Sequence, residues 1–344
     1  MGDKDPPNSK EESRLERMIK IEVKKHPEPI ITPEMCREGV TSARNPAATK
    51  YNGNYILPLT VRSADSISRI HLSRSSDGIN FQVDRNPFIN TNKDSTKGVE
   101  DPRVIKIKGE YYITFTAFKG VESEKKGEKV NTTRIGLVKT KDFETYYDKK
   151  IILDQYGNNK NCVIFQNRDP GFYVIHRPFF GGKKEKAAAY IARTKDFETW
   201  EDLGVFLRPR EKMWDSQRVG VNTPPILIKL LKNSKVEEAF FILYHGADKE
   251  NIYRMGYILI DPKNPTKILE RSEEALISPD KDSEIGKGPY SAEVKNVVFG
   301  QGAIPYKKNI IRAYYGGADK YTHLVELILK NAEVLEHSRY FEIA

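Results

Sequence analysis

The chain has 344 residues, more than one ordinary hydrophobic core accommodates, so it forms either two domains or one large modular domain. Hydrophobic residues make up 38% and aromatic residues 10% of it, which suffices for a substantial core and excludes a chain that is disordered throughout. The net charge is +9, but the lysines are interleaved with acidic residues and no nucleic-acid recognition pattern is present, so we expect no nucleic-acid partner.

The chain begins with a polar and charged stretch. No uncharged apolar segment approaches the roughly 20 residues that span a bilayer, and the first residues lack the apolar centre of a signal peptide. We therefore expect a cytoplasmic protein that does not engage a membrane. Residues 1–24 are expected to form a tail, disordered to about residue 11 and helical over Glu12–Ile19, and residues 25–344 to form a single domain.

The cysteine content predicts neither a disulfide framework nor a metal site. Cys36 and Cys162 are the two cysteines, and no Cys/His spacing typical of zinc sites surrounds them. We interpret both as free thiols.

From about residue 25, short β-branched and aromatic runs separated by Gly, Asn, Asp and Pro are typical of all-β structure. A turn followed by an aromatic-rich strand recurs five times, at steps of 57, 61, 68 and 70 residues. A second strand, a Ser/Thr-x-Asp turn and an aromatic residue follow the first three copies. Five such units predict a five-bladed β-propeller, whereas a pair of β-sandwiches would give no reason for the repeat. The recurring strands contain Tyr55, Tyr112, Tyr173, Phe241 and Ile311.

Unusual polar residues occur in or beside these strands. We expect the recurring strand to be the innermost of each blade, where loops at one end of the channel form a funnel. Charges at equivalent places of several blades would be buried without partners unless they formed one site. The residues are Arg62, Asp101, Arg103, His176, Arg177, His245 and Asp319.

One carboxylic acid among several cations suits protonation of a leaving oxygen while an anion is held on the opposite side. An inverting glycosidase needs a second carboxylate to activate water. A phosphorylase does not, because phosphate is itself an anionic nucleophile that positive charges can hold in place.

The motifs of the chain resemble those of glycoside hydrolase family 130, the inverting β-mannoside phosphorylases, and of related protist enzymes that build and degrade β-1,2-mannan. The resemblance runs from about Asn45 to Asp319, and its most specific stretch is GVEDPRVIKIKGEYYITFTA. Shorter matches are RNPAA, KNCVIF, HRP, WDSQRVG with its later PPI, LYHG, NVVF and YYGGAD. The family implies a propeller that phosphorolyses a β-mannoside to α-mannose 1-phosphate, with a β-1,2 linkage expected ahead of β-1,4.

The resemblance also implies roles for single residues. Asp101 corresponds to the general acid, which in several members acts through the mannose 3-hydroxyl; a structural alternative is that it caps a turn before Pro102. Arginine suits the phosphate site because its planar fork binds phosphate oxygens in a bidentate way. The implied phosphate ligands are Lys160, Asn161, Arg177, Arg218 and His245. The implied sugar ligands are Asn45, Arg62, Arg103, Tyr253 and Asp319.

Manno-oligosaccharide and inorganic phosphate are the implied partners, with phosphate as co-substrate and neither a metal nor another cofactor; relatives form homo-oligomers. The chain departs from the family pattern at GVNTPPI, at KNCVIF and over residues 283–295, so linkage and acceptor stay open. Three other functions remain: a β-mannoside hydrolase with a carboxylate base, a transferase that extends β-1,2-mannan from GDP-mannose, and a non-catalytic sugar-binding propeller.

Overall fold

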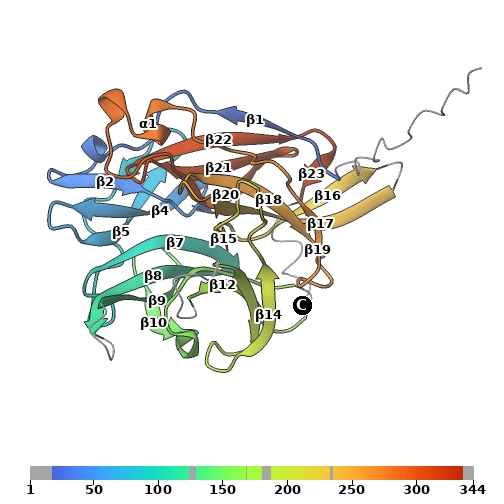
Figure 1. Ribbon diagram of the computed structural model, residues 1–344, viewed down its shortest axis with the longest axis horizontal. Helices are drawn as coiled ribbons and strands as arrows, with labels where there is room; N and C mark the ends of the chain where they lie inside the picture. Colours follow the sequence, from blue (N-terminus) through green and yellow to red (C-terminus); the bar gives the residue numbers. More distant parts are fainter. Residues whose placement is uncertain (1–17, 124–128, 168, 180–186, 233–234, 336–344) are drawn as a thin grey trace, which may run out of the picture.

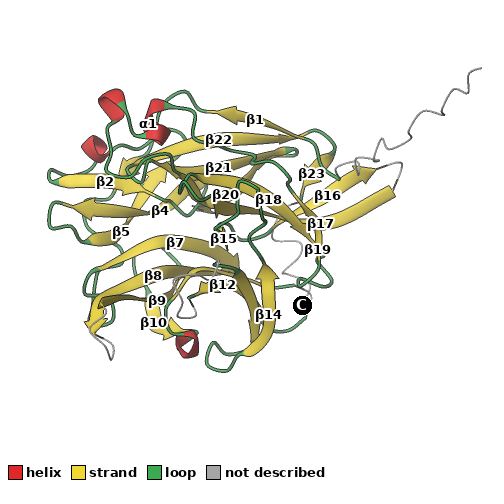
Figure 2. Cartoon of the chain, viewed as in Figure 1, coloured by secondary structure: helices red, strands yellow, loops and turns green. Residues whose placement is uncertain are grey.

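The computed structural model describes residues 18–123, 129–167, 169–179, 187–232 and 235–335 (Figure 1). Within these ranges the chain is nearly all β, with strands β1 to β23, one single-turn α-helix and three short 3₁₀ helices (Figure 2). The all-β prediction is therefore confirmed. The helix expected over Glu12–Ile19 falls mainly outside the described residues, and Met18 and Ile19 are not helical.

The strands fall into five antiparallel groups in chain order. The first group contains β2 (Val40–Arg44), β3 (Thr49–Tyr51), β4 (Asn54–Ser63), β5 (Ser68–Ser75) and β6 (Gln82–Val83). The second contains β7 (Gly98–Ile107), β8 (Glu110–Ser123), β9 (Lys129–Thr140) and β10 (Tyr147–Ile152). A parallel pairing of Ser68 with Gly98 joins these two groups into one nine-stranded sheet.

Each of the other three groups is a separate sheet. The third contains β11 (Asn159–Phe165), β12 (Phe172–Pro178), β13 (Ala189–Thr194) and β14 (Glu201–Leu207). The fourth contains β15 (Arg218–Val221), β16 (Ile226–Lys232), β17 (Lys235–Ala247), β18 (Tyr253–Ile260), β19 (Ile268–Arg271) and β23 (Ala332–Val334). The fifth contains β20 (Val298–Lys307), β21 (Ile310–Gly317), β22 (Tyr321–Leu329) and β1 (Ile21–Lys25). The helices are α1 (Asp282–Ile285) and the 3₁₀ turns Pro33–Met35, Asp154–Tyr156 and Gly288–Tyr290.

Strand β1 corrects the boundary expected after residue 24. Ile21 to Lys25 pair antiparallel with Leu329 to Val325 of β22, so the sheet begins within the expected tail. Ile21 and Val23 alternate with charged residues and pack on the core between the fourth and fifth groups. The N-terminal strand thus completes a sheet whose other strands come from the C-terminal third of the chain (Figure 1).

The repeat seen in the sequence corresponds to a repeated turn. Thr140 and Thr194 each accept a backbone hydrogen bond from the phenylalanine three residues later, at 3.0 and 2.9 Å. Asp142 and Asp196 then accept bonds from the next two backbone amides. These amides lower the pKa of both aspartates, that of Asp196 to about 2. The shared phrase TKDFET therefore encodes a turn with its own local hydrogen bonds.

The hydrophobic core lies between the faces of successive groups. One cluster joins the first and second groups, a larger one joins the second, third and fourth, and another joins the fourth and fifth. A further cluster packs the fifth group against the first, where the rings of Tyr314 and Phe81 meet edge to face at 5.9 Å. Each fully buried aliphatic or Phe side chain contributes about 1.5–3 kcal/mol relative to exposure. Packing therefore runs through all five groups and returns from the last to the first.

The recurring aromatic strands are β4, β8, β12, β17 and β21, and at least one other strand of the same group precedes each of them along the chain. The preceding strand, such as β7 or β11, supplies more of the polar pocket described below. The expectation that the recurring strand lies innermost and carries the site is thus only partly right. Among the described residues, no helix has the length and apolar content to cross a bilayer.

Candidate active site

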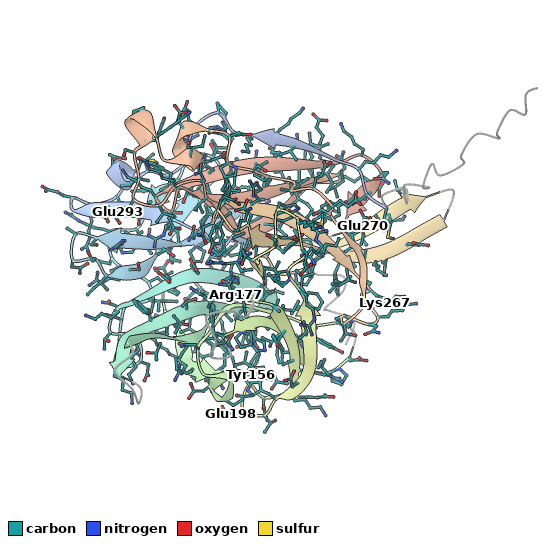
Figure 3. The ribbon with its side chains drawn as sticks, in the orientation of Figure 1. Tyr156, Arg177, Glu198, Lys267, Glu270 and Glu293 are labelled. Carbon is teal, nitrogen blue, oxygen red and sulfur yellow. The ribbon has the colours of Figure 1, made fainter. Side chains whose placement is uncertain are left out.

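A pocket of about 200 Å³ gathers polar side chains from all five groups. Arg177, labelled in Figure 3, lies near the middle of the molecule, where the groups meet. Apolar side chains of Val294, Val297 and Phe299 form one part of the wall. The polar wall consists of Arg44, Asn45, Glu100, Asp101, Lys160, Asn161, Arg177, His245, Tyr253 and Asp319.

Three successive groups build their share of this wall with the same backbone irregularity. Asn45, Asp101 and Asn161 have left-handed backbones, with φ of 52°, 55° and 58°. Asn and Asp tolerate this conformation because their short polar side chains bond locally. Pairing register shifts after Glu100 in β7 and after Lys160 in β11, and such a bulge re-aims adjacent side chains. The adjacent pairs that line the pocket are Arg44 and Asn45, Glu100 and Asp101, and Lys160 and Asn161.

Asp101 is held from three sides and is only 8% exposed. Asn45 Nδ2 donates to Asp101 Oδ1 at 2.9 Å and reaches Asp319 Oδ1 at 3.4 Å. The Asp101 backbone N–H donates to Thr60 Oγ1 at 2.9 Å, and Arg103 Nη1 donates to the Asp101 carbonyl at 3.0 Å. This carboxyl group is therefore fixed in direction, as a proton donor to a bound ligand must be.

Arg44 and Glu100 are pocket residues that the sequence analysis missed. Arg44 Nε lies 3.4 Å from Asp319 Oδ1, and its Nη2 lies 3.9 Å from Glu100 Oε2. Burial opposes the charge of Arg44, but the carboxylates of Asp319, Glu100 and Asp101 outweigh it and raise its pKa. Burial, followed by the charge of Asp101, raises the pKa of Glu100. Their positions in the sequence could have identified both residues, since Arg44 directly precedes Asn45 and Glu100 directly precedes Asp101, which were already assigned to the site.

The opposite part of the site is cationic. Arg103 and Arg177 are 2% and 4% exposed, and burial is the main cause that lowers the pKa of each to about 10. Both stay charged at neutral pH. Arg103 Nη2 donates to Asn161 Oδ1 at 3.2 Å, and the buried Nε of Arg177 has no hydrogen-bond partner among the described residues. Buried cations without paired carboxylates are expected to bind an anion.

His245 is fully buried beside these cations. Its Nδ1 lies 2.6 Å from Asn222 Oδ1, and its Nε2 lies 3.0 Å from Arg177 Nη1, so the neutral ring donates from Nδ1 and accepts at Nε2. Burial, and then the charges of Arg177 and Arg103, hold its pKa well below the usual range. Gly220 makes this packing possible, because a Cβ there would lie 2.5 Å from the His245 ring.

Four predicted residues lie elsewhere than in the pocket wall. Arg218 donates to the Tyr253 hydroxyl and to Asn251 Oδ1, both at 2.9 Å, and so sits directly behind a pocket residue. Arg103 supports Asn161 from behind the wall. Arg62 is partly exposed and lies 3.7 Å from the exposed Glu293.

His176 is buried against Asn159 and the ring of Tyr156, and burial lowers its pKa to about 4. Figure 3 places Glu293, the neighbour of Arg62, well apart from Arg177, and neither Arg62 nor His176 is among the residues that line the pocket. The structure therefore does not bring Arg62 or His176 into the pocket.

No group of three or more His, Cys, Asp or Glu side chains in the described part of the chain is arranged to hold a metal ion. A second, open hollow of about 1040 Å³ lies beside Trp214 and Arg254, and none of the predicted site residues lines it. The smaller pocket combines carboxyl groups, buried cationic side chains and hydrogen-bonding groups.

Comparisons with known proteins agree with this chemistry. The family model of glycoside hydrolase family 130, described as β-1,4-mannooligosaccharide phosphorylase, matches residues 14–337. The chain is 31% identical over 315 residues to the 1,2-β-oligomannan phosphorylase of Thermoanaerobacter sp. (strain X514), covering 88% of this chain and 96% of that protein. It is 34% identical over 279 residues to the β-1,2-mannobiose phosphorylase of Listeria innocua serovar 6a, covering 78% of this chain and 68% of that protein.

A solved structure of β-1,2-mannobiose phosphorylase from Listeria innocua, in complex with β-1,2-mannobiose, is similar with a TM-score of 0.72 at 28% identity. The similarity covers 89% of this chain and 96% of that one. The family match over residues 14–337 spans all the strands that build the pocket. On these grounds the chain belongs to glycoside hydrolase family 130.

Proposed function

We propose that the protein catalyses the reversible phosphorolysis of β-linked manno-oligosaccharides with inversion, giving α-mannose 1-phosphate and a shortened acceptor. The observation that carries this proposal is the placement of Asp101 in the same small pocket as Lys160, Asn161, Arg177 and His245. The relatives at 31% and 34% identity are named as phosphorylases of β-1,2-mannosides, which favours a β-1,2 substrate.

In the proposed reaction, the terminal mannose lies between Asp101 and the cationic residues. Asp101 gives its proton to the glycosidic oxygen, directly or through a sugar hydroxyl, while the bond from C1 to that oxygen breaks. A phosphate oxygen attacks C1 from the opposite face, and the new C1–O–P bond has inverted configuration. The acceptor leaves with the proton, and the Asp101 carboxylate regains one from solvent or from the next phosphate.

The cationic residues hold the attacking phosphate and offset its charge. Arg177 can present its fork to two phosphate oxygens, and its unpartnered Nε is available for this. His245 accepts a bond from Arg177 in the structure, so a bound phosphate oxygen would take over that guanidinium donor. Asn45, Tyr253 and Asp319 line the same pocket and are proposed to bind the hydroxyls of the transferred mannose.

We propose that the five strand groups are the blades of a five-bladed propeller. The support is the continuous packing from each group to the next and from the fifth back to the first. β1 in the last blade would then tie the N-terminal strand into the ring. This arrangement explains why residues from Arg44 to Asp319 meet in one pocket.

The carboxylates favour phosphorolysis over hydrolysis. A hydrolase needs a carboxylate base across the sugar from the acid. Glu100 directly precedes Asp101 in β7 and lines the pocket beside it, so it lies on the side of the acid and not across the sugar from it. Phosphate is then the co-substrate, and the proposed steps use neither a metal nor another cofactor. Cys36 and Cys162 are free thiols, in keeping with the proposed cytoplasmic location.

The test is an assay of purified protein on β-1,2- and β-1,4-mannobiose, with and without phosphate. We expect α-mannose 1-phosphate only with phosphate, and faster from the β-1,2 disaccharide. Equal release of free mannose without phosphate would favour the hydrolase, and chain growth from GDP-mannose alone would favour the transferase. Asp101→Asn should lower turnover by roughly 10²- to 10⁴-fold and leave phosphate binding intact; undiminished turnover would refute the acid.

A further inference from the structure

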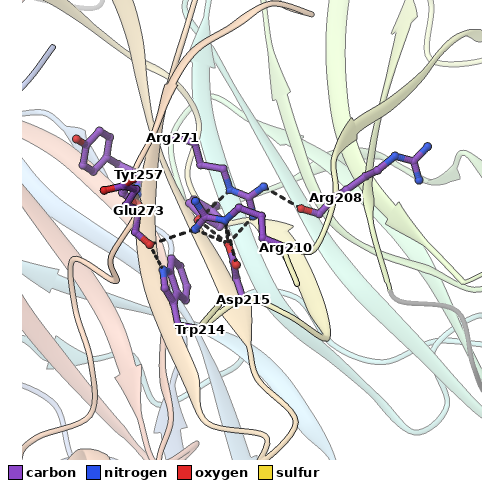
Figure 4. Close-up of polar contacts among 9 residues, drawn as sticks. Arg208, Arg210, Trp214, Asp215, Tyr257, Arg271 and Glu273 are labelled. Atoms are coloured by element: carbon purple, nitrogen blue, oxygen red, sulfur yellow. Dashed lines mark hydrogen bonds and ion pairs between the residues drawn. The ribbon is translucent and has the colours of Figure 1, made fainter. Parts of the chain in front are cut away.

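A buried ion cluster fastens the loop that leads into β15. This loop, residues 208–217, crosses from β14 of the third group to β15 of the fourth. Asp215 is fully buried within it and accepts hydrogen bonds from Arg210 Nη2 and from the Tyr244 hydroxyl, both at 2.9 Å. Arg271 Nη2 donates to the same carboxylate oxygen (Figure 4). One carboxylate therefore holds two guanidinium groups.

Further bonds tie the same loop to the sheet of the fourth group. Arg271 Nη1 donates to the Arg208 carbonyl at 2.8 Å, and Trp214 Nε1 donates to the Glu273 carbonyl at 2.9 Å (Figure 4). The loop can pack closely on the sheet because Gly246 lacks a side chain: a Cβ on this residue would lie 2.2 Å from the Cβ of Asp215. The loop thus rests directly on strands β17 and β18.

The cluster is joined to the phosphate end of the site through two short stretches of backbone. Arg218 begins β15 three residues after Asp215, and the backbone N–H of Gln217 between them donates to the Ala247 carbonyl at 2.9 Å. Tyr244, which bonds Asp215, directly precedes His245 in β17. Adjacent residues of a strand face opposite sides, so Tyr244 meets the cluster while His245 meets the pocket.

Arg218 depends on this placement. Its guanidinium spans Tyr253 and Asn251, and its charge acts on both Arg177 and His245. Asp215 is not among the residues that line the pocket, and it touches none of the proposed phosphate ligands. Any effect of Asp215 on phosphate must therefore act through the position of the loop.

We propose that Asp215 is a positioning residue for phosphate: by holding Arg210, Arg271 and Tyr244 together, it fixes the loop that places Arg218 beside the anion site. This inference rests on the proposed phosphorolysis. Losing the Asp215 charge leaves two partly buried arginines without a counter-charge, and the loop must move to hydrate them. Arg218 moves with it, whereas Asp101, Asn45 and Asp319 belong to other groups and stay in place.

The test compares Asp215→Asn with the wild type in the phosphorolysis direction. We expect the KM for phosphate to rise at least tenfold, while the KM for the mannoside and kcat at saturating phosphate change less than twofold. A purely structural role would lower the amount of active enzyme and leave both KM values unchanged. The matched control is Glu326→Gln, which removes an ion pair with the buried Arg312 in the fifth group and should leave both KM values unaltered.

Tyr244→Phe removes only the hydroxyl that bonds Asp215, and it tests the positioning role if Asp215→Asn does not fold. It should raise the KM for phosphate by a smaller factor with the same selectivity. An unchanged KM for phosphate, or an equal rise of both KM values, overturns the positioning role. If the wild type shows no need for phosphate, the proposed function itself fails, and calorimetric titration of phosphate into wild type and variants then tests the positioning role alone.

Discussion

His323 provides a quantitative test of the packing in the fifth group. Its ring is fully buried and stacked on Tyr315 at 5.2 Å, and neither ring nitrogen has a hydrogen-bond partner among the described residues. Burial, and then the charges of Lys281, Lys25 and His26, lower its pKa to about 3. The folded protein therefore keeps this histidine neutral at any pH near neutrality.

In the unfolded chain, His323 is exposed to water and can take up a proton. An exposed histidine has a pKa of about 6.5, so below this pH the unfolded state binds a proton that the folded state excludes. Stability is then lost as the pH falls from about 6.5 toward the folded value. At pH 5.5, one unit below the unfolded pKa, His323 alone should lower the free energy of unfolding by about 1.4 kcal/mol relative to pH 7.5.

The perturbation is His323→Phe, which keeps an aromatic ring on Tyr315 and removes the titration. Urea denaturation followed by tryptophan fluorescence at pH 7.5 and pH 5.5 measures the free energy of unfolding. The variant should lose about 1.4 kcal/mol less than the wild type between these pH values, because Glu100 and the other carboxyl groups are common to both proteins. Val325→Ala, a buried neighbour on β22, is the control and should cost the same at either pH.

A pH dependence that is identical in wild type and His323→Phe would refute this reasoning. It would mean that the ring is protonated in the folded protein or hydrated by a route that the packing does not show. The exposed turn aspartates do not interfere, since their lowered pKa values place their protonation below this window.

The site supports three further predictions. Arg177→Met should weaken phosphate binding roughly 10- to 100-fold, the range of a lost charged hydrogen bond, with little change in sugar binding; calorimetry measures both. Phosphate should raise the pKa of His245 by offsetting the cations around it, as NMR titration of the ring with and without phosphate will show; an unchanged pKa would contradict this. Arg44→Met should free Asp319 and raise the KM for the mannoside but not for phosphate, and a change confined to phosphate would contradict this assignment.

The amino-acid sequence alone determined the all-β fold class and pointed to Asp101 as the acid. Short β-branched and aromatic runs bounded by turn residues favour strands. The repeated TKDFET turns form their own local hydrogen bonds in the structure. Asp101 was assigned as the acid from the resemblance of its EDPR motif to the family; the structure places it in the pocket, and its role as acid stays a prediction. These features are local, so a linear reading is enough to find them.

Only the tertiary structure decided which polar residues share the pocket. Arg62 and His176 occupy strands like those of the site, yet Arg62 points to Glu293 and His176 into the core beside Asn159. Arg44 and Glu100 enter the pocket because each directly precedes a left-handed residue, with a register shift beside Glu100, so that two adjacent residues turn toward one side, contrary to strict alternation. Strand β1 likewise depends on pairing with β22, some 300 residues away. Such outcomes are set by register and packing between distant strands, which a single sequence does not express.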